Sequence, residues 1–105
     1  MWRFCSIKKA IRKQDSIGRW GGEEFLIILP ETNLKGGTKI AEKLRKAIEN
    51  NKIVYNYYDL YVTITFGVSV YDKAKDINEC IKEADKSLYL GKIRNKNCVV
   101  SSDEI

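Results

Sequence analysis

Histidine is absent from this sequence of 105 residues, and its absence excludes several kinds of catalytic site. A Ser-His-Asp triad, a Cys-His pair, a histidine-containing zinc site and acid–base catalysis by imidazole all require that side chain. The three cysteines, Cys5, Cys80 and Cys98, are widely spaced and form no Cys-x-x-Cys motif, so we expect reduced thiols. Any chemistry must therefore rely on carboxylates, amines, backbone N–H groups or a bound hard metal ion.

Long apolar runs are missing too. The longest, at residues 25–29, is far shorter than the ~20 residues that a membrane-spanning helix needs. Lys8 and Lys9 follow the N-terminus before any apolar signal-peptide core, so we expect a cytoplasmic location, or the cytoplasmic part of a larger protein. The length and the charged fraction of 31% indicate a single globular domain over residues 1–105. A net charge of +5 favours anionic partners such as nucleotides or nucleic acid.

Alternating patterns and short apolar runs predict the strands. They cover Ser16–Trp20, Glu24–Leu29, Tyr61–Tyr71 and Cys98–Val100. The alternation is clearest in the third strand, with Val, Ile and Phe on one face and Thr, Gly and Ser on the other. A turn at Gly21-Gly22 joins the first two strands into a β-hairpin that Pro30 ends. The Tyr- and Asn-rich segment Lys52–Leu60 predicts a loop with an edge strand.

Apolar residues at helical spacing predict three helices. The first covers residues 2–13, the second is capped by Thr32 or Asn33, and the third opens at Asp76. The residues expected to face inward are Ile40, Ala41, Leu44, Ala47 and Ile48 in the second helix, and Ile77, Ile81, Ala84 and Leu88 in the third. The order helix, hairpin, helix, strand, helix, strand favours an α+β fold, with helices covering an antiparallel sheet.

The hairpin tip is the segment best suited to chemistry. Gly21 and Gly22 carry no side chains, so backbone N–H groups there can approach a phosphate closely. A carboxylate directly after them, on Glu23, is placed to hold Mg²⁺ beside that phosphate. An ordinary Gly-Gly hairpin turn followed by two solvated glutamates would give the same local pattern.

Taken together, four segments resemble the GGDEF family, the diguanylate cyclases of bacterial signalling. Residues 21–25 (Gly-Gly-Glu-Glu-Phe) match the family signature in its GGEEF form, and Arg19 stands where the family has its preceding arginine. Residues 62–69 resemble the strand that ends in a glycine, residues 84–89 the ADxALY helix, and residues 92–97 the AKxxGRN segment. The chain departs from the family's alanine, glycine and arginine at Gly91, Asn95 and Lys96.

The resemblance implies a fold and a reaction. The expected fold is the ferredoxin-like palm of nucleotidyl cyclases, an antiparallel-rich sheet with flanking helices. In the implied reaction, two facing domains condense two GTP molecules into cyclic di-GMP and two pyrophosphates, with Mg²⁺ or Mn²⁺ as cofactor. By matching positions, Glu23 is the metal ligand and catalytic carboxylate, with Glu24 as a second catalytic residue. The residues implied to bind the nucleotide phosphates are Gly21, Gly22, Lys92 and Lys96, and for each lysine the alternative is a solvated surface charge.

A second site is implied just before the signature. Arg12-Lys13-Gln14-Asp15 resembles the RxxD inhibitory site, at which cyclic di-GMP binds away from the catalytic centre. The guanidinium of Arg12 can pair with phosphate and stack on guanine, and Asp15 can accept hydrogen bonds from the guanine edge. A helix-end arginine and an aspartate that starts a strand would show the same residues. We expect Arg12 and Asp15 to lie near each other on the surface.

The resemblance covers the C-terminal part of a GGDEF domain. The family's first strand, which carries an aspartate metal ligand, has no counterpart, so we expect a fold truncated at its N-terminus and little activity in this chain alone. Without that central strand, Glu24–Leu29 and Tyr61–Tyr71 would keep unpaired backbone groups. We expect the gap to close by direct pairing of these two strands or by a homodimer that exchanges strands or helices.

Other functions remain open from the residues alone. One is a receptor module that binds cyclic di-GMP through Arg12 and Asp15 without making it. Another is a basic nucleic-acid-binding domain, but Tyr55, Tyr57 and Tyr58 cluster in an expected loop instead of forming a stacking pair on a sheet. We therefore expect GTP and cyclic di-GMP as ligands, a sensory domain in the parent protein as regulator, and no nucleic acid as partner.

Overall fold

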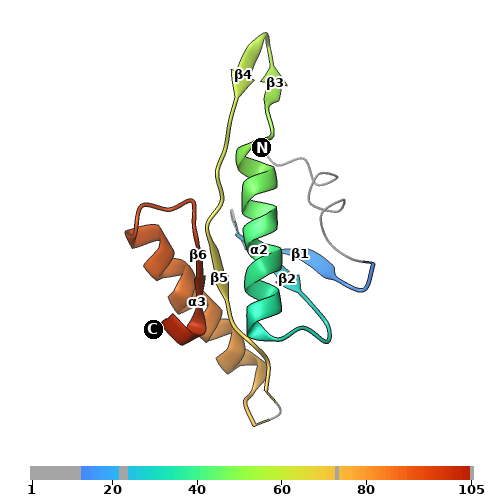
Figure 1. Ribbon diagram of the computed structural model, residues 1–105, viewed down its shortest axis with the longest axis vertical. Coiled ribbons are helices and arrows are strands. Elements are labelled where there is room, and N and C mark those ends of the chain that lie inside the picture. Colours follow the sequence, from blue (N-terminus) through green and yellow to red (C-terminus); the bar gives the residue numbers. More distant parts are fainter. Residues whose placement is uncertain (1–12, 22–23, 73, 105) are drawn as a thin grey trace.

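The computed structural model describes residues 13–21, 24–72 and 74–104, which form two helices and three two-stranded sheets (Figure 1). The strands pair as β1 (Ser16–Gly21) with β2 (Glu24–Ile28), β3 (Ile53–Tyr55) with β4 (Tyr58–Leu60), and β5 (Phe66–Val68) with β6 (Val99–Ser101). The helices are α2 (Leu34–Glu49) and α3 (Ile77–Ile93), and a short 3-10 turn η1 (Ser102–Glu104) follows β6. The predicted α+β fold is confirmed, while the helix predicted over 2–13 lies almost wholly outside the described residues.

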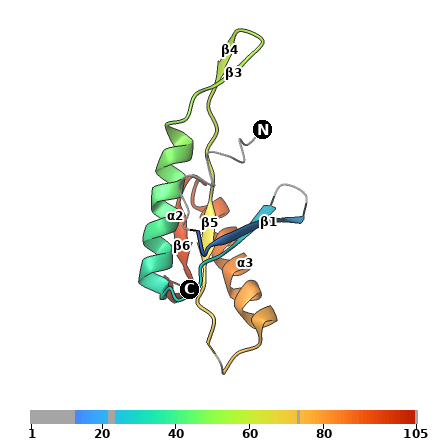
Figure 2. The ribbon, with the colours of Figure 1, turned by 90° about the vertical axis from the view of Figure 1, so that its right-hand side faces the viewer.

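The core lies where α2 and α3 cover opposite faces of the β5–β6 sheet (Figure 2). β5 and β6 run parallel, with Gly67 beside Val100. Gly67 faces α3, whereas the next side chain along β5, that of Val68, lies against Gly37 of α2. The fully or nearly buried apolar residues come from both helices and β6: Ala41, Leu44, Ile48, Cys80 and Val100.

Helix α2 begins at the predicted cap. The side chain of Asn33 accepts a hydrogen bond of 2.7 Å from the backbone N–H of Gly36, which satisfies a donor that the first helical turn leaves unpaired. Asn33, not Thr32, is therefore the cap. Four residues at helical spacing are buried: Gly37, Ala41, Leu44 and Ile48. Ala47, predicted to face inward, is exposed, because it lies at the margin of this apolar stripe.

Helix α3 buries small residues. Its cap Asp76 accepts from the backbone N–H of Asn78 at 3.3 Å, as the sequence predicts. The prediction that Ile77 faces inward is wrong, since this side chain is 52% exposed at the first helical position. Ile81, Ala84 and Leu88 are half-buried, and the most buried positions are Cys80, Ser87 and Gly91. Small side chains on this face let the backbone of β5 approach the helix directly.

The strand predicted over Tyr61–Tyr71 is much shorter in the structure. Only Phe66–Val68 pairs, because β6 offers a partner of the same three-residue length. From Thr65 to Ser69 the polar face of this segment lies against α3, whereas Thr63 is exposed. Ser69 donates a hydrogen bond of 2.6 Å from its hydroxyl to the carbonyl of Cys80, and Thr65 Oγ1 accepts one of 3.0 Å from the N–H of Asn97.

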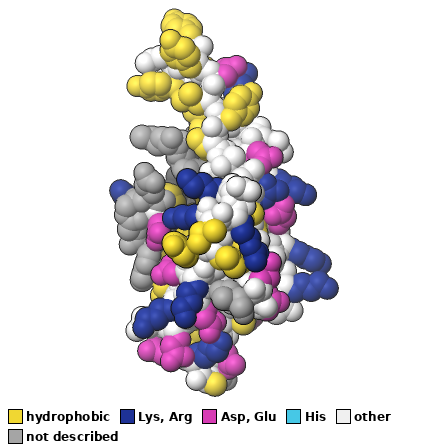
Figure 3. Space-filling view, turned by 90° about the vertical axis from the view of Figure 1, so that its left-hand side faces the viewer, with side chains coloured by type: hydrophobic (Ala, Val, Ile, Leu, Met, Phe, Trp, Pro, Cys, Tyr) yellow, Lys and Arg dark blue, Asp and Glu magenta, His cyan; other side chains and the backbone are white. Residues whose placement is uncertain are grey.

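The β3–β4 hairpin projects from the body along the long axis of the molecule (Figure 1). Its two-residue turn, Asn56-Tyr57, has φ values of 48° and 68°, as a tight hairpin turn requires. The expected loop with an edge strand is thus a complete hairpin. Hydrophobic side chains gather at this end (Figure 3), where the most exposed large residues are Val54, Tyr55, Tyr57 and Tyr58.

Strands β2 and β5 do not pair within the described part of the chain. The prediction of direct closure between them is therefore wrong. Each belongs to its own two-stranded sheet, and Val68 of β5 and Leu29, the residue after β2, both lie beside Gly37 of α2. The alternative, a dimer that exchanges strands or helices, stays a prediction.

Position 91 of α3 requires a glycine, because the methyl group of Thr65 occupies the space that a side chain at this position would need. A Cβ at position 91 would lie 2.7 Å from the methyl group of Thr65 and 3.3 Å from Cys98 Sγ. We expect Gly91→Ala to lower the free energy of unfolding by about 1–3 kcal/mol, the usual cost of overpacking. Thr65→Ser removes the methyl group and keeps the hydroxyl, so the double variant should recover stability in urea unfolding. Equal losses with and without Thr65→Ser would contradict this account.

Candidate functional site

The signature segment forms the predicted hairpin. β1 and β2 are antiparallel, with Arg19 opposite Phe25 and Gly21 opposite Glu24, and the register shifts between Arg19 and Gly21 as the strands approach the turn. Gly22 and Glu23, the centre of the predicted site, lie outside the described residues. The placement of Glu23 therefore stays a prediction, and the geometry of the site begins at Glu24.

Glu24 joins the hairpin to the end of α3. Its carboxylate oxygen lies 3.9 Å from Nζ of Lys92, and both side chains are about half exposed. The two residues belong to separate segments that the sequence analysis singled out, the signature and the lysine segment. The structure brings them together at one place. An exposed ion pair of this length adds little stability, so its main consequence is the position it gives the Lys92 amine.

The loop after α3 brings Lys96 back to the same end of the helix. The backbone N–H of Lys96 donates a hydrogen bond of 3.0 Å to the carbonyl of Gly91, one residue before Lys92. Asn95, Lys96 and Asn97 have φ values of 85°, 58° and 47°, so three consecutive residues other than glycine adopt the left-handed conformation. Lys96 is exposed. The backbone of Lys96 therefore lies at the end of α3 that carries Lys92, and the Lys92 amine faces Glu24 at the start of β2.

A polar network that the sequence analysis missed supports this loop. Arg45 of α2 donates to Asn97 Oδ1 at 3.0 Å and to Glu49 at 3.0 Å, and the amide nitrogen of Asn97 donates to Glu49. Hydrogen bonding to Arg45 lowers the pKa of Glu42, and the same contact raises the pKa of Arg45. In the sequence, these charges on α2 are spaced as ordinary surface pairs, and nothing local indicates that they reach residue 97.

The predicted inhibitory site is only partly described. Asp15 is 9% exposed, so the prediction that it lies on the surface is wrong for this residue. It precedes β1 directly, where the chain turns into the hairpin. Arg12 lies outside the described residues, and its distance from Asp15 is not tested.

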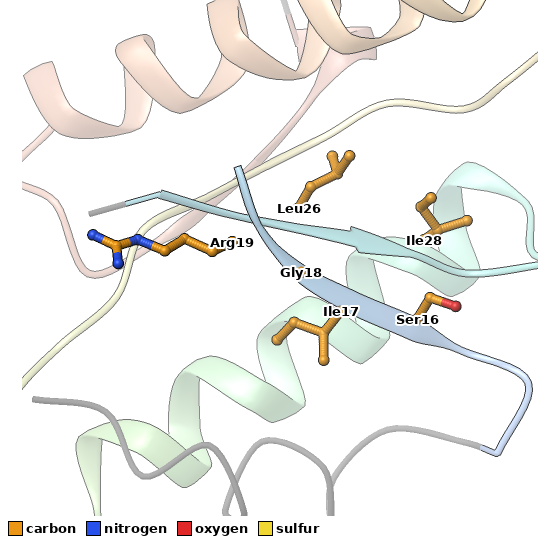
Figure 4. A pocket seen from close by; sticks show the side chains of 6 residues that line it. All are labelled: Ser16, Ile17, Gly18, Arg19, Leu26 and Ile28. Carbon is orange, nitrogen blue, oxygen red and sulfur yellow. The ribbon is translucent and has the colours of Figure 1, made fainter. Parts of the chain in front are cut away.

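A shallow hollow of about 240 Å³ runs along the hairpin (Figure 4). It is lined by Ser16, Ile17, Gly18, Arg19, Leu26 and Ile28. Of these, the sequence analysis singled out Arg19 alone. The hollow is apolar and neither Glu24 nor Lys92 lines it, so we do not count it as part of the candidate site.

The donor groups that a metal ion needs are not assembled by the described residues. No cluster of three or more carboxylate or thiol side chains occurs among residues 13–21, 24–72 and 74–104. Glu24, the signature carboxylate that belongs to the described residues, pairs with Lys92. These residues alone do not assemble a metal site, and the metal-binding role expected of Glu23 stays a prediction. In the same ranges, no helix is long and apolar enough to cross a membrane.

The family model described as "Diguanylate cyclase, GGDEF domain" matches residues 5–98. The chain belongs to the GGDEF family. Diguanylate cyclase A of Treponema denticola is 38% identical over an alignment of 100 residues. This alignment covers 91% of this chain and 26% of that protein. The GGDEF domain thus spans about a quarter or less of the length of the first curated relatives it matches.

Solved structures agree with the fold of this GGDEF domain. Diguanylate cyclase SiaD of Pseudomonas aeruginosa, solved in complex with its activator SiaC, is 28% identical and superposes with a TM-score of 0.86, covering 92% of this chain and 37% of that one. The GGDEF domain of DgcB from Caulobacter crescentus, solved in complex with c-di-GMP, is 20% identical with a TM-score of 0.86, covering 94% of this chain and 60% of that one. The second match supports the fold alone.

Proposed function

We propose that residues 1–105 belong to a single GGDEF domain that, in the intact protein, condenses two GTP molecules into cyclic di-GMP and two pyrophosphates. The observation that carries this proposal is the contact of 3.9 Å between Glu24 and Lys92, which joins the signature hairpin to the lysine segment. A carboxylate hairpin beside two lysines suits a triphosphate, because cations neutralise its charge while backbone N–H groups hold its oxygens. We propose little turnover by the isolated chain.

Each site residue has a proposed role. Gly21 and Gly22 leave room for the nucleotide phosphates at the hairpin tip. Lys92 and Lys96 offer positive charge where α3 ends, and as lysine in place of arginine, Lys96 acts as a point charge without a bidentate fork. Glu23 takes the proton of the attacking hydroxyl and offers its carboxylate to Mg²⁺ or Mn²⁺. Glu24 holds the Lys92 amine.

The bonds formed and broken in the proposed reaction balance with GTP as the only reactant. The 3′-oxygen of one GTP forms a bond to the α-phosphorus of the other, and the bond from that phosphorus to the bridging oxygen of the β-phosphate breaks. Pyrophosphate leaves, and two such steps close the ring. A divalent ion would supply charge neutralisation at the phosphates. Because each GTP attacks the other, two domains must face each other, which supports a homodimer. We propose separately that a sensory domain of the intact protein controls this homodimer.

Incubation of the intact protein with GTP and Mg²⁺, followed by chromatography of the products, tests this function. Cyclic di-GMP and pyrophosphate in a ratio of one to two are the expected products. The isolated chain should yield far less than the intact protein. GTP recovered unchanged from the intact, folded protein would contradict the proposal.

A second function is favoured by the RxxD spacing before the signature. In this alternative, the domain binds cyclic di-GMP through Arg12 and Asp15 and makes none. We expect Arg12→Ala to weaken binding of cyclic di-GMP at least about tenfold in calorimetry, because a charged hydrogen bond to phosphate is lost. Lys13→Ala, which removes the neighbouring charge at a variable position of the motif, is the matched control. Equal affinity of the two variants would reject a site at Arg12.

A further inference from the structure

Asn97 ties the loop that carries Lys96 to two other parts of the molecule. Its side-chain oxygen accepts a hydrogen bond of 3.0 Å from Arg45, and its amide nitrogen donates to Glu49, both on α2. Its backbone N–H donates to Thr65 Oγ1 at 3.0 Å, just before β5. One residue thus connects the end of α3, the C-terminal half of α2 and the start of β5.

The loop needs such an anchor because its backbone conformation is unfavourable. Asn95, Lys96 and Asn97 all have positive φ, and a residue with a Cβ pays energy for this conformation unless the surroundings hold it there. The backbone bond from Lys96 to the carbonyl of Gly91 holds one point of the loop. Asn97 holds the other end through its side chain.

Arg45 is well placed to act as the fixed part of this anchor. Its side chain is 14% exposed, and its guanidinium also pairs with Glu42 and Glu49 on its own helix. The planar fork of an arginine satisfies several acceptors at fixed angles, which a lysine cannot do. The side chains that bind Asn97 are therefore positioned by contacts within α2 and do not depend on the loop.

We propose that Asn97 is a positioning residue: its contacts with Arg45 and Glu49 fix the left-handed loop and so place Lys96 beside Lys92 to bind the phosphates of a nucleoside triphosphate. The role of Lys96 rests on the proposed function, whereas the anchoring of the loop does not. Asn97 touches no phosphate itself in this arrangement. It acts through Lys96.

Hydrogen exchange of the Lys96 amide in the ¹⁵N-labelled chain tests the anchor directly. In Asn97→Ala we expect this amide to exchange at least about tenfold faster, because losing one net hydrogen bond to a charged group destabilises the loop by that factor. Asn95→Ala is the matched control: it makes the same change at positive φ, and the side chain of Asn95 has no hydrogen bond among the described residues. Equal acceleration in both variants would overturn the proposal.

A variant that retains the size of the side chain guards against general unfolding. Asn97→Asp keeps the acceptor for Arg45 but places a carboxylate against Glu49, so we expect faster exchange at Lys96 with unchanged amides in the middle of α2 and α3. Arg45→Lys should act in the same direction. Unchanged exchange at Lys96 in both variants, with the fold intact by circular dichroism, would contradict the anchor.

Binding of GTP with Mg²⁺, followed by NMR titration, tests whether the anchor acts through Lys96. We expect Asn97→Ala to weaken binding several-fold in the natural chain and to add nothing in the Lys96→Ala background, because residues that act as one unit are not additive. An additive loss would show that Asn97 acts elsewhere. If Lys96→Ala leaves GTP binding unchanged, the proposed function of this lysine fails, while the exchange measurement still decides whether Asn97 anchors the loop.

Discussion

Gly67→Ala is expected to leave most of the chain unfolded, or to lower its free energy of unfolding by at least about 3 kcal/mol. A Cβ at this position would overlap the carbonyl oxygen of Ala84 and the backbone nitrogen of Leu88, and would lie 3.0 Å from Leu88 Cα. These are backbone atoms of α3, so no side-chain rotation can relieve the clash. Typical domains are stable by only about 5–15 kcal/mol, and the β5–α3 contact is the centre of this core.

Gly18→Ala is the matched control for this substitution. A Cβ at Gly18, in the middle of β1, would meet nothing within 4 Å, so this variant should unfold in urea close to the wild-type midpoint. The comparison separates the steric requirement at Gly67 from any general effect of replacing a strand glycine. A Gly67→Ala chain as stable as Gly18→Ala would show that β5 does not pack backbone to backbone on α3.

Glu23→Gln is expected to reduce formation of cyclic di-GMP by the intact protein at least about 100-fold, the usual size of a lost acid–base or charge-stabilising group. Glutamine has nearly the same shape, but it cannot take the proton of the attacking hydroxyl and carries no charge for a metal ion. Thermal unfolding should be nearly unchanged, because glutamine retains the size and shape of the glutamate side chain.

Glu31→Gln makes the same chemical change outside the site, in the exposed turn after β2. It should leave product formation within about twofold of wild type, because a surface charge remote from the site contributes little. Chromatographic product assays on both variants under identical conditions give the comparison. Equal activity of Glu23→Gln and Glu31→Gln would contradict the proposed role of Glu23.

Elements with local signals could be predicted from the sequence. Asn33 and Asp76 cap helices because their short polar side chains satisfy the first free N–H groups, and the hairpin forms because apolar strands flank a turn. Features that depend on distant partners could not. The strand around Gly67 is limited by the length of β6, and the exposure of Ile77 depends on what packs beside the first turn of α3.

The candidate site divides in the same way. The motif residues Glu24, Lys92 and Lys96 could be named from the sequence, because family resemblance fixes their order along the chain. The contact of Glu24 with Lys92 and the return of the Lys96 backbone to the end of α3 are properties of the fold. The anchoring of Asn97 by Arg45 joins residues 52 positions apart, and an Arg flanked by Glu on a helix gives no sign of such a partner.

The proposed nucleotide site between the hairpin and the loop after α3 is tested most directly by titrating the ¹⁵N-labelled chain with GTP and Mg²⁺. We predict that the amides of residues 21–24 and 92–96 shift together, with one shared binding curve, and that Lys92→Ala weakens that curve. Shifts confined to the exposed β3–β4 hairpin, or shifts at residues 21–24 that leave residues 92–96 unmoved, would contradict a shared triphosphate site.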